Sequence, residues 1–285
     1  MILATVVSNN EAREDIDFLP LSVDYQEKFA SSGKIPGGFL KREGRLSDHE
    51  VLICRLVDRV LRPLFPNDYR ADTQVMLSLI SADSEALPDC LAALAASAAL
   101  TISDIPFNGP IAEVRIIKLD EKYIINPTPD QITSASLNLI VGASKDNICM
   151  VEGESNEVSE DEIIEALKVA HEAIKDLCEL QIKFLENIDN PKLREYSHVN
   201  SDLELENHIN EKTFDKIYKV ASKGIPSKKE RTEAFDKIKE EYLSTIEQNE
   251  DFDKFLFNKY CHDVEKNAIR QAVLDKKIRL DGRKL

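Results

Sequence analysis

A change of pattern near Asn190-Pro191 constrains the fold of this chain more than any other sequence feature. Upstream, over residues 1–188, short apolar and β-branched runs alternate with stretches that have the apolar spacing of helices, which predicts an α/β domain. Downstream, over residues 201–278, the apolar residues keep helical spacing on a strongly charged background. We therefore expect an α/β domain and a small all-helical domain, joined by a linker over residues 189–200.

Local signals predict the individual elements. The pairs Ser47/Glu50 and Ser159/Glu162 have capping-box spacing, which predicts helices that begin near residues 48 and 159. Pro88-Asp89 opens a buried helix rich in alanine and leucine. Strands are predicted over residues 2–7, 19–25, 74–81, 111–118, 123–125, 137–142 and 148–152, and the last three helices over residues 203–222, 228–248 and 252–273.

Composition limits the class of protein. The 285 residues are 42% hydrophobic and 31% charged, which is typical of a soluble globular chain with a real core. Five widely separated cysteines without a CxxC pair argue against a disulfide framework and a zinc site, and favour a reducing cytoplasm. No leader sequence is evident, and the longest apolar run, residues 91–100, is about half of what spans a bilayer, so we expect no membrane insertion.

Positive charge is concentrated in one stretch, residues 34–66. The whole chain carries a net charge of −15, whereas residues 41–62 contain six basic and four acidic side chains. A polyanion would therefore have to be held by a local patch. Pro36-Gly37-Gly38 marks a loop whose backbone can approach a partner closely, and that loop presents a candidate RNA-binding set: Phe39, Lys41, Arg42 and Arg45.

Phe39 has two possible roles. It could be a platform on which an RNA base stacks, or it could pack beneath its own loop. The sequence does not choose between these two roles.

The helix that follows the loop carries Arg55, Arg59 and Arg62 on one side, while Leu52, Leu56 and Val60 lean toward another. Guanidinium groups in such a stripe could grip phosphate oxygens. Alternatively, they could form a solvated or ion-paired helix face that involves Asp58, and periodicity alone favours this second interpretation. The adjoining basic loop shifts the balance toward phosphate binding.

No pattern for chemistry is visible in the residues themselves. The histidines lack HxxxH and HExxH spacing, and P-loop, GxSxG and GxGxxG motifs are missing from the sequence. Asp83, Asp89 and Asp104 could meet around a magnesium ion, but Asp89 is explained by the start of a helix, and ordinary capping accounts better for these aspartates. We predict no metal site in this chain.

Several segments together resemble the polynucleotide phosphorylase family: IPGGFLKREGRLSDHEVLICRLVDRVLRPLFP, ALAASAAL, SDIPFNGPI and IRLDGR. The resemblance implies two RNase PH-like cores, each with a mixed sheet and packed helices, joined by an all-helical domain and followed by KH and S1-type domains in a ring-shaped trimer. It also implies degradation of RNA from the 3′ end with inorganic phosphate as co-substrate, which releases nucleoside diphosphates and serves mRNA turnover.

On that plan, residues 1–188 resemble a first core without its opening strands, residues 201–278 the helical domain, and residues 279–285 the start of a second core. The first core of the family is non-catalytic, so the resemblance implies no catalytic residue in this chain and Mg2+ ligands outside it. The implied partners are single-stranded RNA and two further copies of the protein, with no DNA, and the implied compartment is the cytoplasm.

The family's pore loop usually has two phenylalanines followed by two arginines. Here it reads Phe39-Leu40-Lys41-Arg42, which keeps the charge but replaces one ring and one guanidinium. The resemblance implies that this loop grips passing RNA, and that Arg55, Arg59 and Arg62 are the relic of a phosphate-side helix. A non-catalytic RNA-binding or scaffolding module is the alternative function.

Overall fold

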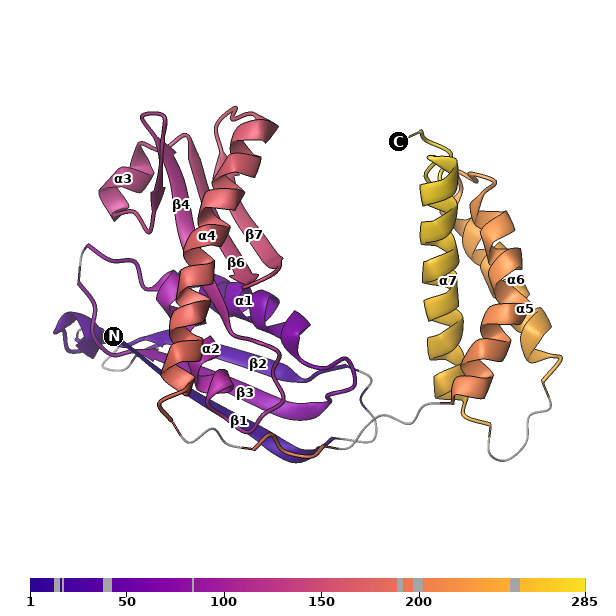
Figure 1. The fold of residues 1–285 in the computed structure, drawn as a ribbon, viewed down its shortest axis with the longest axis horizontal. Coiled ribbons are helices and arrows are strands. Elements are labelled where there is room, and N and C mark those ends of the chain that lie inside the picture. The colour runs from indigo at the N-terminus through magenta and orange to yellow at the C-terminus, as the bar shows by residue number, and fades with distance from the viewer. Residues whose placement is uncertain are drawn as a thin grey trace. The chain divides into compact units, whose positions relative to one another are not determined.

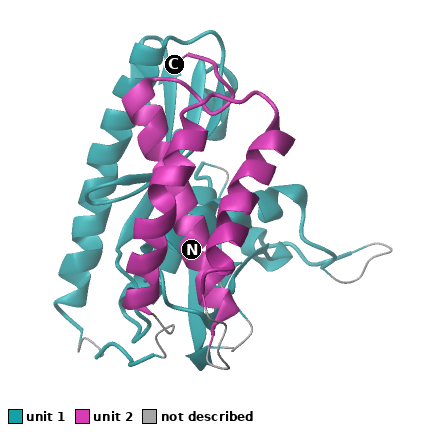
Figure 2. Ribbon diagram, turned by 90° about the vertical axis from the view of Figure 1, so that its right-hand side faces the viewer, with its two compact units in different colours: residues 1–199 teal, residues 200–285 magenta. Residues whose placement is uncertain are grey.

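A computed structural model describes residues 1–12, 16, 18–37, 43–83, 85–188, 192–196, 202–246 and 252–284. The chain forms two compact units, Met1–Val199 and Asn200–Leu285, which Figure 2 shows in different colours. Each unit has hydrophobic packing of its own.

The first unit begins with a three-stranded mixed sheet. Its strands are β1 (Ile2–Ala12), β2 (Leu21–Glu27) and β3 (Ala71–Leu79), in the order β1-β3-β2. β1 runs antiparallel to β3, and β2 runs parallel to it. The parallel pair requires a crossover, and the helix α1 (Asp48–Leu61) lies within it. The mixed sheet is confirmed, although β3 begins before the predicted residue 74 because buried Ala71 and Thr73 already follow its alternating pattern.

A second sheet is antiparallel throughout. Its order is β5 (Lys122–Ile125), β4 (Ile111–Leu119), β6 (Leu137–Ser144) and β7 (Ile148–Ser155). The long helix α4 (Glu160–Leu185) packs on β4 and β6, and its N-terminal capping box is present as predicted. A short helix, α3 (Pro129–Thr133), was not predicted, although Thr128 and Gln131 form a capping box there.

The helices α1 and α2 (Asp89–Thr101) lie between the two sheets, and the larger core joins them to both (Figure 1). The predicted capping box of Ser47 and Glu50 starts α1. Leu56 and Val60 are buried in this core, whereas Leu52, expected on the same face, is 46% exposed.

The described residues of the second unit form three helices: α5 (Leu203–Ala221), α6 (Lys228–Leu243) and α7 (Lys254–Lys276). Their shared core includes Ile209, Tyr242 and Phe257. α6 ends before the predicted residue 248, and the hydroxyls of Ser244 and Thr245 there bond to backbone carbonyls of the last turn. None of the helices in the described residues combines the length and the apolar character needed to cross a bilayer.

Candidate nucleic-acid interface

The loop between β2 and α1 is clamped at its base by two glutamates. Glu50, in the first turn of α1, accepts hydrogen bonds from the backbone N–H of Ser47 at 2.6 Å and of Glu27 at 2.8 Å. Inside this pair, Glu43 accepts the N–H of Phe29 at 2.9 Å and forms an ion pair with Lys28 at 3.2 Å. The loop therefore leaves and rejoins the domain at one fixed place.

Most of the candidate RNA-binding set lies in that loop. Phe39, Lys41 and Arg42 are outside the described residues. Arg45 is described: its side chain is exposed, and no hydrogen bond or ion pair engages it within the described chain. Arg45 is thus free to meet an anion at the base of the loop.

The arginine stripe of α1 lines an open cavity of about 400 Å³ together with Leu21, Val23, Cys54 and Asp58. The three arginines therefore share one side, as their spacing predicted. Arg62 is fully engaged there: it bonds both oxygens of Asp58, at 3.0 and 2.6 Å, and the carbonyl of Leu19 at 2.7 Å. This guanidinium fastens the end of α1 to the chain that enters β2.

The other two arginines differ in their engagement. Arg59 forms an ion pair with Glu152 of β7, with both side chains about half exposed. Arg55 is exposed and has no ion pair or hydrogen bond among the described residues. The ion-paired interpretation of the stripe therefore describes Arg59 and Arg62, and only Arg55 is unengaged.

The aspartates considered for magnesium have separate partners. Asp83 accepts the N–H groups of Glu85 and Ala86, each at 2.9 Å. Asp104 binds Arg194, whose hydrogen bond holds the pKa of that carboxyl below its usual range. Within the residues that the structure describes, no three His, Cys, Asp or Glu side chains gather as metal ligands would. These three aspartates therefore do not fit a magnesium ion.

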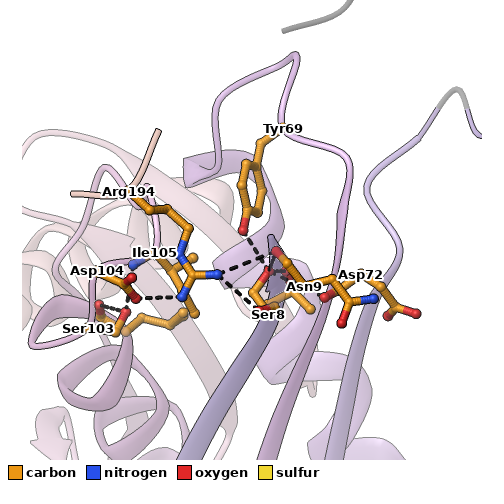
Figure 3. A network of polar contacts seen from close by, with 10 residues as sticks. Ser8, Asn9, Tyr69, Asp72, Ser103, Asp104, Ile105 and Arg194 are labelled. Carbon is orange, nitrogen blue, oxygen red and sulfur yellow. Dashed lines mark hydrogen bonds and ion pairs between the residues drawn. The ribbon is translucent and has the colours of Figure 1, made fainter. Parts of the chain in front are cut away.

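Arg194 serves a structural purpose instead (Figure 3). Its backbone N–H donates to the carbonyl of Asp104 at 2.8 Å, and its guanidinium donates to the carbonyl of Ser8 in β1 at 2.9 Å. The Ser8 hydroxyl in turn lies 2.6 Å from the hydroxyl of Tyr69. This network ties the segment after α4 to the connection after α2 and to the first sheet.

Asp89 is the first residue of α2 and not its N-cap, which is Pro88, and no side-chain hydrogen bond caps this helix start. One Asp89 oxygen accepts the N–H of the next residue, Cys90, at 2.8 Å, and the other binds Arg115 of β4 in an almost buried ion pair. The capping prediction is therefore wrong for Asp89, which is engaged by Arg115 instead. Arg115 also donates to the side chain of Asn138 at 2.7 Å.

The same place holds an unexpected buried acid, Glu113, in a cavity of about 260 Å³ that Asp89 and Arg115 also line. Burial, helped by the charge of Asp89, raises the pKa of Glu113 to about 8, so the carboxyl is mostly protonated at neutral pH. This cluster was not predicted from the sequence. The signal was present, since Glu113 and Arg115 are charged residues at alternating positions of an otherwise apolar strand.

Comparisons with known proteins agree with this architecture. Residues 1–106 match the model described as "3' exoribonuclease family, domain 1", and residues 109–173 match domain 2 of that family. Residues 204–284 match "Polyribonucleotide nucleotidyltransferase, RNA binding domain". These matches place the chain in the 3′ exoribonuclease class.

Similarity to individual curated proteins identifies a particular family within this class. The chain is 56% identical over its whole length to the polyribonucleotide nucleotidyltransferase of Cytophaga hutchinsonii, and 52% identical to that of Bacteroides fragilis. It is 50% identical to that of Porphyromonas gingivalis. The chain belongs to the polyribonucleotide nucleotidyltransferase family, as its motifs predicted. It spans 40% of the length of the first two relatives and 38% of the third.

Proposed function

We propose that this chain is the N-terminal part of a phosphorolytic 3′-to-5′ exoribonuclease that uses inorganic phosphate to release nucleoside diphosphates from RNA. The observation that carries the proposal is the similarity over the entire chain, at 50–56% identity, to proteins named for that transferase activity. In this proposal residues 1–188 form the first core, 201–278 the helical domain, and 279–285 the start of a second core.

The chain's own contribution is to guide RNA rather than to cleave it. The loop that carries Phe39, Lys41 and Arg42 rises from a base fixed by Glu43 and Glu50, next to the unengaged Arg45. Lys41 and Arg42 would contact the phosphates of a passing strand through their charges, which position the strand without reading its bases. Arg55 offers one further cation, whereas Arg59 and Arg62 serve the fold.

Magnesium acts, in this proposal, through ligands outside the chain. Asp83 is engaged by backbone N–H groups, and Asp89 and Asp104 are engaged by arginines, so we assign these three aspartates no metal and no catalytic step. We further propose that the full-length protein is a cytoplasmic homotrimer that binds single-stranded RNA.

The test of the activity uses the full-length protein with a single-stranded RNA. Nucleoside diphosphates should appear only when inorganic phosphate is added. The 285-residue chain alone should release none. Phosphorolysis by the short chain would contradict the proposed division of labour, and its lack in the full-length protein would favour a non-catalytic RNA-binding module.

The test of the loop is the variant Lys41→Ala with Arg42→Ala in the full-length protein. RNA affinity should fall, and the slope of log affinity against log salt should flatten by about 0.7 for each lost phosphate contact. The matched control is Lys122→Ala with Lys183→Ala, two exposed lysines far from the loop in sequence. An unchanged slope in the loop variant would remove this loop from the RNA path.

A further inference from the structure

One end of the helical unit concentrates positive charge in a chain whose net charge is −15. Residues 219–231 and 275–284 together carry ten basic side chains against three acidic ones. The basic residues are Lys219, Lys223, Lys228, Lys229, Arg231, Lys276, Lys277, Arg279, Arg283 and Lys284. These two segments are called the basic end below.

The fold brings these distant segments into contact. After α7, residues 278–284 form a tight turn in which the N–H of Arg279 donates to the carbonyl of Arg283 at 2.8 Å. The turn sits against the α5–α6 connection so closely that a Cβ added at Gly224 would lie 2.9 Å from the Cα of Gly282. The last turns of α5 and α7 are also joined, since Tyr218 donates to Asp275 at 2.8 Å. The ends of all three helices therefore meet here (Figure 1).

Most of this charge is not neutralised locally. Asp281 is engaged by Arg283 at 2.6 Å, and Asp275 by Tyr218 and Gln271. Lys229 reaches Glu233 only at 3.9 Å. Six exposed lysines have no ion-pair partner in the described part of the chain: Lys219, Lys223, Lys228, Lys276, Lys277 and Lys284.

Helix stability accounts for only some of these lysines. Lys219 and Lys276 lie in the last turns of α5 and α7, where cations complement the negative end of the helix dipole. Lys228 and Lys229 occupy the first turn of α6, where the dipole disfavours cations. The helix dipole therefore does not account for Lys228 and Lys229.

We infer that the basic end binds the phosphate backbone of single-stranded RNA. The inference rests on the proposed function and deepens it, because it assigns RNA contacts to particular residues within the region that matches an RNA-binding domain. Lysines are flexible point charges, so they contact phosphates without reading the sequence of bases. In these two segments, which are fully described, Ile278 is the one exposed large apolar side chain, with Leu274 next to them in sequence, which favours a polyanion over a lipid surface.

The test is a full-length variant in which Lys219, Lys223, Lys276 and Lys277 are all changed to Gln. Its binding to a fluorescent oligouridylate is measured over a salt series without phosphate. We expect at least about tenfold weaker binding at low salt. The slope of log affinity against log salt should flatten by up to about 2.8, or 0.7 for each contact with a single strand.

Two matched variants control for charge and for folding. The first changes Lys212, Lys237, Lys254 and Lys266, exposed lysines elsewhere on the three helices, to Gln and should bind within about twofold of the wild type. The second changes the four test lysines to Arg, which keeps the charge and should keep the binding. If the Gln variant fails to fold, the variant with Lys228→Gln and Lys284→Gln still measures the change in slope.

Three outcomes would overturn the inference. The salt slope of the Gln variant could equal that of the wild type, or the control Gln variant could lose as much affinity. The variant could also lose binding to phosphatidylserine vesicles while RNA binding persists, which would assign the basic end to a membrane. Phosphorolysis of the same RNA, measured on the same preparation, tests the proposed function separately. Its readout is the release of diphosphates, whereas the test of the basic end reads RNA affinity without phosphate.

Discussion

Arg55 and Arg62 differ in role although they belong to one stripe. Arg62 uses its planar fork on Asp58 and on the carbonyl of Leu19, whereas Arg55 contacts no polar partner within the described residues. Arg62→Lys should therefore lower the free energy of unfolding by about 1–2 kcal/mol, because an ammonium cannot reproduce the forked contacts. Arg55→Lys, the matched control, should stay within about 0.5 kcal/mol.

Urea denaturation of the 285-residue chain measures both effects. Equal stability of the two variants would show that the contacts of Arg62 contribute nothing to the fold. The comparison also separates stability from binding, since Arg55 is the arginine of the stripe that remains available to phosphate.

Glu113 makes stability depend on pH in an unusual direction. Its pKa is 4.5 in the unfolded chain and about 8 in the folded one, so between these values the folded state binds more protons than the unfolded state. Stability therefore falls as pH rises through this window, by at most about 1.4 kcal/mol per pH unit from this group. Below pH 4.5 and above pH 8 the group adds no further slope.

Glu113→Gln tests that sign. The amide cannot ionise, so the variant should gain stability relative to the wild type when urea denaturation is moved from pH 5.5 to pH 8. Glu154→Gln, an exposed carboxylate on β7, is the control and should show no such gain. A stability difference between Glu113→Gln and wild type that is constant over this range would mean that Glu113 is ionised in the fold.

At the scale of elements, close packing of α1 on the second sheet depends on Gly142. A Cβ built at this position of β6 would lie 2.7 Å from Cγ2 of Val60 and 3.3 Å from Cγ of Glu113. Gly142→Ala should therefore destabilise the chain by about 1–3 kcal/mol, because the stiff valine on α1 has to move. Gly44→Ala meets nothing within 4 Å and should be nearly neutral.

Thermal unfolding followed by circular dichroism measures this pair. If Gly142→Ala left the thermal stability unchanged, α1 and β6 could move apart without loss of stability. The comparison also isolates packing from backbone entropy, since both substitutions add the same methyl group and both restrict the unfolded chain.

The element boundaries show which signals are local. Ser47 and Glu50 are close in sequence, so the start of α1 could be predicted to the residue. The extent of β1 could not, because its last residues are strand only through pairing with distant β3, where Ala12 meets Ala71. For α6 the predicted end was too late. The apolar residues keep helical spacing beyond Ser244 and Thr245, where the helix ends.

At the scale of the whole molecule, the helical unit has a core of its own. The buried residues of this core, among those that the structure describes, all come from α5, α6 and α7. A fragment of residues 201–285 should therefore fold alone, with helical circular dichroism and a cooperative thermal transition. A fragment that is unfolded at 25 °C would show that the unit depends on the rest of the chain.

The sequence by itself determined the class of fold, the three helices of the second unit and the family, because periodicity, caps and motifs are written in neighbouring residues. Only the tertiary structure decided which charges are available. It paired Arg62 with Asp58 and Arg59 with Glu152, buried Glu113 beside Asp89, and gathered lysines from the middle and the end of the helical unit's sequence around Gly224 and Gly282. The physical reason is that an ion pair or a desolvated acid depends on distance in space, which separation along the chain does not reveal.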